Sequence, residues 1–476
     1  MVISRVISQN GRNYMEHNGL PRLMLGVQIR LDDAVRAGCC EREIEEYFAK
    51  AAECNFPAVC IPIEWSIPIN WDKSIDWDCD VDSYLPDRDS PYVQRCLAYA
   101  DKYNLSVHWL WFGSNVLAGQ SRVPKDIVNN PVTYPQFTYE ENGRKETVID
   151  VTTPAFIERE KEALGWFLGQ LKKFDKNHRT CVIQIQNEPN YHGFRGQRKE
   201  RLKAIGILGS FIKESDFSLV TRVNITSPEY LLNEDPLIDE LLALDGVDVY
   251  INRVEFCSDF ADRMNMTGTN IAHFAELGPH VDVITRIMGD SLQRSCGMLI
   301  YELRTVGKFH EYDFGLYRRH DHEWIKRDGR VPVQYQWTAG EFTTESVTDD
   351  VALFNKMMLA AENALATCVP GNTAMINAGS KAKIDLMTVS FDADATGNNA
   401  FGIACYGNDG FMYCFTLVDK AYFKINNCMS VETASVGAFE NGEWNELSTV
   451  CLSEDNTLSV TGGLVYRVKV AEIKSV

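Results

Sequence analysis

The sequence predicts an α/β fold: a (β/α)8 TIM barrel followed by a C-terminal all-β, sandwich-like domain. Over the first three-quarters of its 476 residues, short apolar segments alternate eight times with amphipathic ones, which is the rhythm of strand–helix units. The apolar segments are apolar at nearly every position, as in parallel strands that helices cover on both faces. Past residue 370, short β-branched or aromatic segments follow, separated by Gly, Asn and Asp. Eight parallel units favour a closed barrel, and the later segments favour a β-sandwich.

The eight expected strands are rich in β-branched, leucine or aromatic residues. In chain order they are residues 23–30, 58–65, 105–113, the strand that opens the stretch 181–190, 219–226, 247–252, 270–277 and 297–303. The expected helices are 41–55, 92–103, 154–174, 199–213, 235–244, 281–292 and a last helix, 351–367, that closes the ring. A doubly wound open sheet is the alternative. It needs a glycine-rich turn after its first strand, where this chain reads GVQIRLDD.

The same patterns divide the chain into three parts. These are residues 1–20, an N-terminal β-hairpin extension; residues 21–370, the barrel; and residues 371–476, the C-terminal β-sandwich domain. The change of character follows Pro370-Gly371-Asn372, a sequence typical of a turn. Beyond it, the segments that read most clearly as strands are 401–406, 411–418 and 464–470.

Composition and charge argue against several classes of function. The formal net charge of −19 opposes binding to nucleic acid, whose phosphates attract basic surfaces. No apolar run is long enough to cross a bilayer, and the first residues lack the continuous apolar region of a secretory signal. We therefore expect a cytoplasmic protein with neither a nucleic-acid nor a membrane partner. Assembly into a homo-oligomer stays open.

The pattern of ligand-type residues predicts neither a metal nor a cofactor. The fourteen cysteines are scattered, with no CxxC pair and no Cys/His cluster at zinc spacing, so reduced thiols are expected. The aspartates within 76–82 imitate a calcium loop but lack its glycine and its closing glutamate.

Two glutamates stand where expected strands end. Glu188 follows the fourth strand in CVIQIQNEPN, and Glu276 closes the seventh in HFAELGP. Asn187-Glu188-Pro189 also reads as a simple turn. In a barrel of this kind, however, the chemistry lies at the carboxyl ends of the strands. Two carboxylates facing each other there, one an acid/base and one a nucleophile, are what a retaining glycosidase needs.

Three glutamates compete for the role of nucleophile. Glu302 lies on the expected eighth strand, and Glu341 lies beyond it in the sequence WTAGEFTT. Choosing Glu341 would leave the seventh and eighth strands without places in a ring of eight. The strand count therefore favours Glu276 as the nucleophile and Glu188 as the general acid/base.

The chain also resembles a known group of enzymes. An Asn-Glu pair closing strand four, with a second glutamate closing strand seven, is the signature of glycoside hydrolase clan A. Residues 55–65 (NFPAVCIPIEW) and the aspartates of 76–82 look like the second-strand region of family 35 β-galactosidases. The sequence LWFGSN at 110–115, followed by Val123-Pro124, is similar to the third-strand region of a bacterial branch of that family. Family 42 β-galactosidases share the architecture.

The likeness spans roughly residues 21–304, and one departure from the pattern stands out. Related enzymes often read Glu-Asn-Glu at strand four, whereas this chain reads Gln186-Asn187-Glu188, followed by Pro189 as in other members of the clan. The departure leaves open which family the chain resembles most and which sugar it hydrolyses. It does not change the assignment of Glu188 as the acid/base. β-Galactosides are the expected substrates, with glucosides, mannosides, fucosides and arabinosides as alternatives.

The resemblance implies a sugar pocket around the barrel mouth. Asn187 is expected to bind the substrate 2-hydroxyl. The other expected pocket residues are Gln28, Arg30, Glu64, Trp65, Trp111, Asn115, Tyr250, Asn252, Glu302 and Arg304. Trp65 or Trp111 would cover the apolar face of a sugar ring, with a place in the core as the equal alternative. For Glu302 the alternative is an ion pair with Arg304 or Arg30.

Two rivals come from other classes of function. A metal-dependent barrel hydrolase would need the His-x-His that is absent after the first strand. A carbohydrate-binding barrel without catalysis would use the same pocket aromatics, but it has no need for both Glu188 and Glu276. The expected ligand is in either case an oligosaccharide or small glycoside.

Overall fold

The structure is a computed structural model that describes most of the chain. The described residues are 3–9, 11–36, 39–65, 89–112, 123–141, 144–187, 189, 198–215, 218–225, 244–251, 272–277, 288–289, 292–293, 295–304, 315–320, 323–326, 346–369, 371–395, 400–426, 431–440 and 442–470. For residues 247–251 and 272–277 the description covers the backbone.

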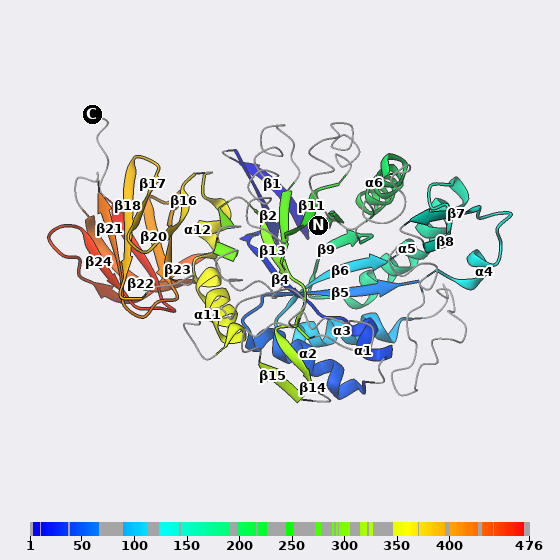
Figure 1. The fold of residues 1–476 in the computed structure, drawn as a ribbon, viewed down its shortest axis with the longest axis horizontal. Helices are drawn as coiled ribbons and strands as arrows, with labels where there is room; N and C mark the ends of the chain where they lie inside the picture. The colour runs from blue at the N-terminus through cyan, green and yellow to red at the C-terminus, as the bar shows by residue number, and fades with distance from the viewer. Residues whose placement is uncertain are drawn as a thin grey trace.

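Eight parallel strands form a closed barrel (Figure 1). They are β4 (Met24–Gln28), β5 (Ala58–Glu64), β6 (Ser106–Phe112), β9 (Thr180–Ile185), β10 (Val220–Ile225), β11 (Gly246–Ile251), β12 (Ala272–Leu277) and β13 (Gly297–Ile300). Each strand pairs with the next one in chain order, and β13 pairs with β4 to close the ring. The parallel sheet expected from the apolar segments is therefore present, close to the expected positions.

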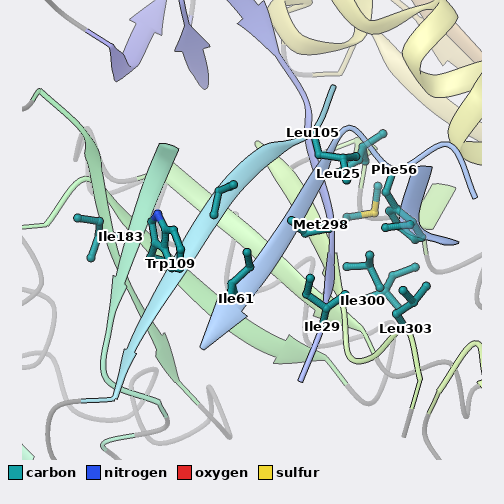
Figure 2. Close-up of a cluster of buried hydrophobic side chains, with 14 of the residues drawn as sticks. Leu25, Ile29, Phe56, Ile61, Leu105, Trp109, Ile183, Met298, Ile300 and Leu303 are labelled. Carbon is teal, nitrogen blue, oxygen red and sulfur yellow. The ribbon is translucent and has the colours of Figure 1, made fainter. Parts of the chain in front are cut away.

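The barrel strands bury both of their faces, which explains why most of their residues are apolar. Ile61, Trp109 and Ile183 are register partners on β5, β6 and β9, and Figure 2 shows them among the buried side chains. The Trp109 ring meets Phe167 of α5 (Pro154–Phe174) at 5.4 Å between centroids. These three side chains therefore face the helix layer. Their neighbours along each strand, such as Leu110, face the barrel interior.

Helices cover the outside of the barrel. Besides α5 they are α1 (Leu31–Arg36), α2 (Glu41–Glu53), α3 (Pro91–Lys102) and α6 (Arg198–Glu214). The short helix α4 (Lys125–Val128) lies beyond α5, next to the hairpin that begins at Gln136 (Figure 1). Two of the helices that cover the barrel begin in the same way. The Ser90 hydroxyl accepts a hydrogen bond from the Val93 backbone N–H at 3.2 Å, and the Thr153 hydroxyl accepts one from the Phe156 backbone N–H at 3.4 Å. A proline follows each of these two residues. A hydroxyl cap with proline at the first helical position fixes where a helix starts, so the expected helix 154–174 has the bounds of α5.

The last expected helix, 351–367, is instead two helices. These are α11 (Val347–Ala360) and α12 (Glu362–Thr367), which meet at Ala361. No glycine or proline interrupts the sequence there. The buried carboxylate of Glu362 accepts hydrogen bonds from Arg22 and from the Leu23 backbone N–H, at 2.8 and 2.9 Å. This tertiary contact holds α12 against the amino-terminal strands and overrides the helical propensity of the segment.

A three-stranded antiparallel sheet lies at the amino-terminal end of the barrel. Its strands are β1 (Ser4–Gln9), β2 (Arg12–His17) and β3 (Leu20–Arg22). The Ser4 hydroxyl bonds to the carbonyl of Cys181, at the start of β9, and accepts from the backbone N–H of Val220, at the start of β10. Since this sheet covers the amino ends of the strands, the carboxyl ends form the opposite mouth.

The C-terminal residues form two antiparallel sheets (orange to red in Figure 1), with α11 and α12 between them and the barrel. The six-stranded sheet contains β16 (Thr373–Asn377), β19 (Phe401–Tyr406), β20 (Phe411–Thr416), β25 (Val465–Val470), β22 (Val431–Glu440) and β23 (Glu443–Val450). The four-stranded sheet contains β17 (Ser380–Ile384), β18 (Met387–Ala393), β21 (Ala421–Asn426) and β24 (Thr457–Val460). Their facing side chains, among them Phe391 and Phe423, form a core of their own.

Two hairpins complete the described elements. They are β7 (Gln136–Glu141) with β8 (Arg144–Ile149), and β14 (Tyr317–His320) with β15 (Glu323–Lys326). Among the helices described above, none combines the length and the apolar character that spanning a membrane would require.

Candidate active site

The two expected catalytic glutamates belong to the fourth and seventh strand–helix units of the chain. β9 is the fourth barrel strand and β12 the seventh. Glu276 lies within β12, where its backbone is the register partner of Tyr250 on β11 and Leu299 on β13. Glu188 follows β9 by three positions and lies outside the described residues, as do Asn115, Asn252 and Glu341. The side chains of Glu276 and Tyr250 also lie outside the description.

The end of β9 is held by an unusual residue, Gln186. Its φ is +64°, a left-handed conformation that residues other than glycine rarely adopt. Its backbone N–H donates to the carbonyl of Trp111 at 2.9 Å, and its own carbonyl accepts from the Gln184 side chain at 3.3 Å. Its side-chain amide donates to Oε1 of Glu160 at 3.1 Å. Gln186 is thus fixed on three sides immediately before Asn187, which is half-buried.

Glu160 is a buried carboxylate on α5 that sequence reasoning missed. It is 2% exposed, and Nε1 of Trp111 donates to its Oε1 at 2.9 Å, beside the Gln186 amide. Burial raises the pKa of Glu160 to about 7, although these two hydrogen bonds act in the opposite direction. The sequence does carry a signal for it. Glu160 falls in the spacing of Phe156, Ile157, Ala163 and Leu164, on the apolar face of the helix.

Trp65 and Trp111 are core residues, which is the alternative that the sequence left open beside a role as sugar platforms. Both are 0% exposed. The Trp111 ring stacks on Phe167 of α5 at 5.9 Å between centroids, and the Trp65 ring meets Phe156 at 5.8 Å. The two rings therefore fill the layer between the barrel and α5. The alternation of side chains explains why: Trp111 is two positions from Trp109 and faces the same helix.

A buried ion pair stands where the first barrel strand ends. Arg30 donates from Nε and Nη2 to the two oxygens of Asp32, at 3.0 and 3.1 Å, and from Nη1 to the Tyr301 hydroxyl at 3.4 Å. Arg30 was an expected pocket residue, and Asp32 was not. Two parallel bonds in a fork fix the guanidinium plane as well as its position.

Gln28 and Glu64 lie in the same region as this pair and are buried. The hydroxyl of Tyr92, from α3, donates to the Pro62 carbonyl at 2.8 Å. Burial raises the pKa of Tyr92 well above its usual value; the charges of Asp32 and Glu64 add to the rise and that of Arg30 opposes it. The charged groups at the ends of β4 and β5 thus lie near the same buried hydroxyl.

Polar side chains also occupy the barrel interior below the mouth. The guanidinium of Arg222 on β10 donates to Oε1 of Gln184 on β9 at 3.0 Å, and the two residues are register partners. His108 on β6 is 1% exposed, and both of its ring nitrogens are without a hydrogen-bond partner among the described residues. Burial, assisted by the charge of Arg222, holds the pKa of His108 well below its usual value, so its ring is neutral.

Glu302 and Arg304 lie to one side of the mouth, beside α2. Glu302 is 0% exposed. The Arg304 guanidinium lies 4.6 Å from the centre of the Trp324 ring. Both charges act on the buried Tyr47 of α2, whose pKa is raised first by burial; Arg304 opposes that rise and Glu302 adds to it. Glu302 is buried, as Gln28 and Glu64 are, and its expected pocket role stays a prediction.

Metal-binding groups do not gather anywhere in the described part of the chain: no three His, Cys, Asp or Glu side chains converge there. The cysteines within the same ranges all have free thiols.

Comparisons with known proteins identify similar structures and no similar sequence. No protein-family model matches the chain, and no curated protein matches it. Among solved structures, it is similar to the β-galactosidase from Bacillus circulans sp. alkalophilus, with a TM-score of 0.51, 11% identity and 74% of this chain covered. This chain spans 58% of that protein's length.

Two further solved structures have lower similarity. One is the endo-β-1,4-mannanase from Thermotoga petrophila (TM-score 0.46, 10% identity, 86% of this chain and 95% of that one). The other is the β-galactosidase from the psychrophilic Marinomonas ef1 (0.47, 9%, 70% and 59%). The likeness to the Bacillus circulans structure, at 11% identity, is a likeness of fold.

Proposed function

We propose that this chain is a retaining exo-β-glycosidase, with Glu188 as the general acid/base and Glu276 as the nucleophile. One observation carries the proposal. Glu276 lies in the seventh strand of the closed ring, and Glu188 follows the fourth strand by three positions in the sequence. Two carboxylates at the carboxyl ends of these strands would stand across the barrel mouth from each other. The fold likeness to the β-galactosidase from Bacillus circulans supports the same reading.

The proposed reaction has two displacements. Glu276 attacks the anomeric carbon while Glu188 gives its proton to the departing glycosidic oxygen, which forms a glycosyl–enzyme ester. Glu188, now ionised, takes a proton from water, and that water attacks the anomeric carbon and releases Glu276. The product therefore has the same configuration at the anomeric carbon as the substrate. This chemistry requires the two carboxyl groups to stand about 5–5.5 Å apart.

β-Galactosides are the proposed substrates. Support comes from the sequence resemblance to family 35 and 42 enzymes. The Bacillus circulans structure, which is similar in fold, is also that of a β-galactosidase. In this scheme Asn187 binds the 2-hydroxyl, while Gln28, the fixed Arg30 and Glu64 supply polar groups at the ends of β4 and β5. We further propose the division of the chain at residues 20 and 370, so that the barrel alone carries the reaction.

The test is substitution of the acid. Glu188→Ala should lower kcat/KM for a disaccharide by about 10²–10⁴-fold, and it should lower the rate on an activated aryl glycoside far less, because that leaving group needs little protonation. Azide should restore turnover and give a glycosyl azide of retained configuration. Glu53→Ala, at an exposed position of α2, is the control and should leave both rates unchanged. A disaccharide rate in Glu188→Ala equal to that of the wild type would refute the assignment.

Two further measurements examine the nucleophile and the sugar. A fluorosugar inactivator should label the peptide that contains Glu276; labelling of Glu302 or Glu341 would reject our choice. A panel of aryl glycosides should show preference for the galactoside. A tenfold preference in kcat/KM for another sugar, about 1.4 kcal/mol of transition-state discrimination, would overturn the specificity. Binding of sugars without turnover of any of them would favour a carbohydrate-binding barrel.

A further inference from the structure

Glu160 joins the helix layer to the point where the chain leaves β9. It lies on α5, outside the barrel, yet its Oε1 accepts from two residues of the barrel wall, Trp111 and Gln186. We propose that Glu160 is a positioning residue that sets the direction in which Asn187 and Glu188 enter the barrel mouth. This inference rests on the proposed function, because it assigns Glu160 a role only through Glu188.

The first argument is the direction of the Gln186 side chain. Side chains alternate along a strand, and Gln184 faces the barrel interior, where it meets Arg222. A regular strand would therefore send Gln186 into the interior as well. Its amide instead reaches Glu160 in the helix layer. The left-handed φ of Gln186 is what turns the chain, and the hydrogen bond to Glu160 holds the turned side chain in place.

The second argument is the rigidity of the contact. The Trp111 ring lies between Phe167 and Trp65, at centroid distances of 5.9 and 6.3 Å, so its Nε1 has a fixed position. That group fixes the Glu160 carboxylate. Trp111 also accepts the Gln186 backbone N–H at its carbonyl. Gln186 is thus bound twice to one immobile residue, once directly and once through Glu160.

The third argument is the presence of a carboxylate in this place. A leucine would pack on the apolar face of α5 without the desolvation that an ionisable group suffers there. Replacement of buried charged groups by apolar side chains is often neutral or stabilising, so we infer that the carboxylate serves here through the geometry that its two hydrogen bonds impose. The geometry imposed here ends two residues before Glu188. Because misplacement of a catalytic group by about 1 Å lowers rates by about 10²-fold, the direction of this segment matters for proton transfer.

The experiment compares three variants on two substrates. Glu160→Leu should lower kcat/KM for a disaccharide by about 10²-fold and for an activated aryl glycoside much less, because the defect lies in protonation. Glu160→Gln keeps an oxygen that can accept both hydrogen bonds, and it should restore most of the disaccharide rate. Gln170→Leu is the matched control. Gln170 is buried on the same helix, but its Oε1 accepts from the Ser90 backbone N–H at 2.7 Å, so its loss should leave the ratio of the two rates unchanged.

A second variant covers the case in which Glu160→Leu does not fold. Gln186→Gly tolerates the left-handed φ but cannot bond to Glu160, and it should show the same selective loss on the disaccharide. In the double variant with Glu160→Leu the two losses should not add, because each removes the same hydrogen bond.

The outcomes separate this inference from the proposed function. If Glu188→Ala has no selective effect on the disaccharide, the proposed function fails, and the role of Glu160 fails with it. If Glu188→Ala has that effect while Glu160→Leu and Gln186→Gly keep the wild-type ratio, the inference alone is overturned. A crystal structure of Glu160→Leu gives an independent answer: Gln186 should leave its φ of +64°, and an unchanged Gln186 would also overturn the inference.

Discussion

The guanidinium of Arg30 and the carboxylate of Asp32 form a two-fold hydrogen-bonded ion pair, with side chains only 10% and 5% exposed, where β4 passes into α1. In water such a pair contributes little. Here both charges are buried, and two donors of Arg30 meet both oxygens of Asp32. Removal of one partner takes this pair of hydrogen bonds away from the buried charge that remains.

We expect Asp32→Ala to lower the free energy of unfolding by about 3–5 kcal/mol for this reason. Urea denaturation at pH 7 measures it. Glu53→Gln is the control, because it removes an ion pair with Lys50 whose side chains are 27% and 56% exposed, and it should change stability by less than about 1 kcal/mol. An equal effect of the two substitutions would contradict the buried character of the Arg30–Asp32 pair.

The raised pKa of Glu160 predicts a pH dependence of stability. The carboxyl has a folded-state pKa of about 7 against an ordinary value of 4.5. Between these values the folded chain holds a proton that the unfolded chain has lost, so stability falls as pH rises. Glu160→Gln lacks this proton. Relative to the wild type it should gain up to about 3 kcal/mol between pH 4.5 and 7, measured as the difference between paired urea curves. A difference that does not vary with pH would show that Glu160 titrates normally.

His17 should make the stability rise with pH, which is the opposite of the effect of Glu160. Its Nε2 lies 2.8 Å from the carbonyl oxygen of His178, and burial lowers its pKa from 6.5 to about 4. The unfolded chain binds a proton in this window that the folded chain does not, so His17 stabilises above pH 6.5 and loses that contribution as pH falls towards 4. We expect His17→Gln to flatten the acid side of the stability curve. Thermal unfolding of both proteins from pH 4 to 7 is the measurement, and parallel curves would refute the expectation.

Substitution of glycine by alanine should have opposite effects on stability at Gly297 and at Gly169. A Cβ on Gly297, at the start of β13, would lie 2.5 Å from the carbonyl oxygen of Met24, so Gly297→Ala should destabilise the barrel by about 1–3 kcal/mol or more. A Cβ on Gly169, in the middle of α5, meets nothing within 4 Å. Gly169→Ala should therefore stabilise by about 0.5–1 kcal/mol. Thermal melting of the two variants compares them directly, and a stable Gly297→Ala would contradict the close approach of β13 to β4.

The sequence predicts the parallel sheet well because most residues of the barrel strands are apolar. The same property hides the direction of each side chain. In a strand that is buried on both faces, Trp109 and Trp111 look like Leu110 in pattern, so only the structure shows that both rings face α5. The break at Ala361 was hidden for another reason, since its cause is a contact of Glu362 with residues more than 300 positions away. The burial of Glu160 could have been predicted from the sequence, because Glu160 is a carboxylate on the apolar face of a helix.

The amino-terminal sheet has a consequence for the order in which the chain matures. Ser4 bonds to Val220, 216 positions later, and Arg12 donates to the carbonyl of Leu292 and the sulfur of Cys368, 280 and 356 positions later. During synthesis, therefore, β1 and β2 leave the ribosome long before their partners exist. Contacts of such long range are slow to form, and domains of this size fold in stages. Strands β1 and β2 are thus synthesised first but reach their final contacts last. Through Arg12 they connect the folded barrel to the end of α12, which leads into the C-terminal sheets.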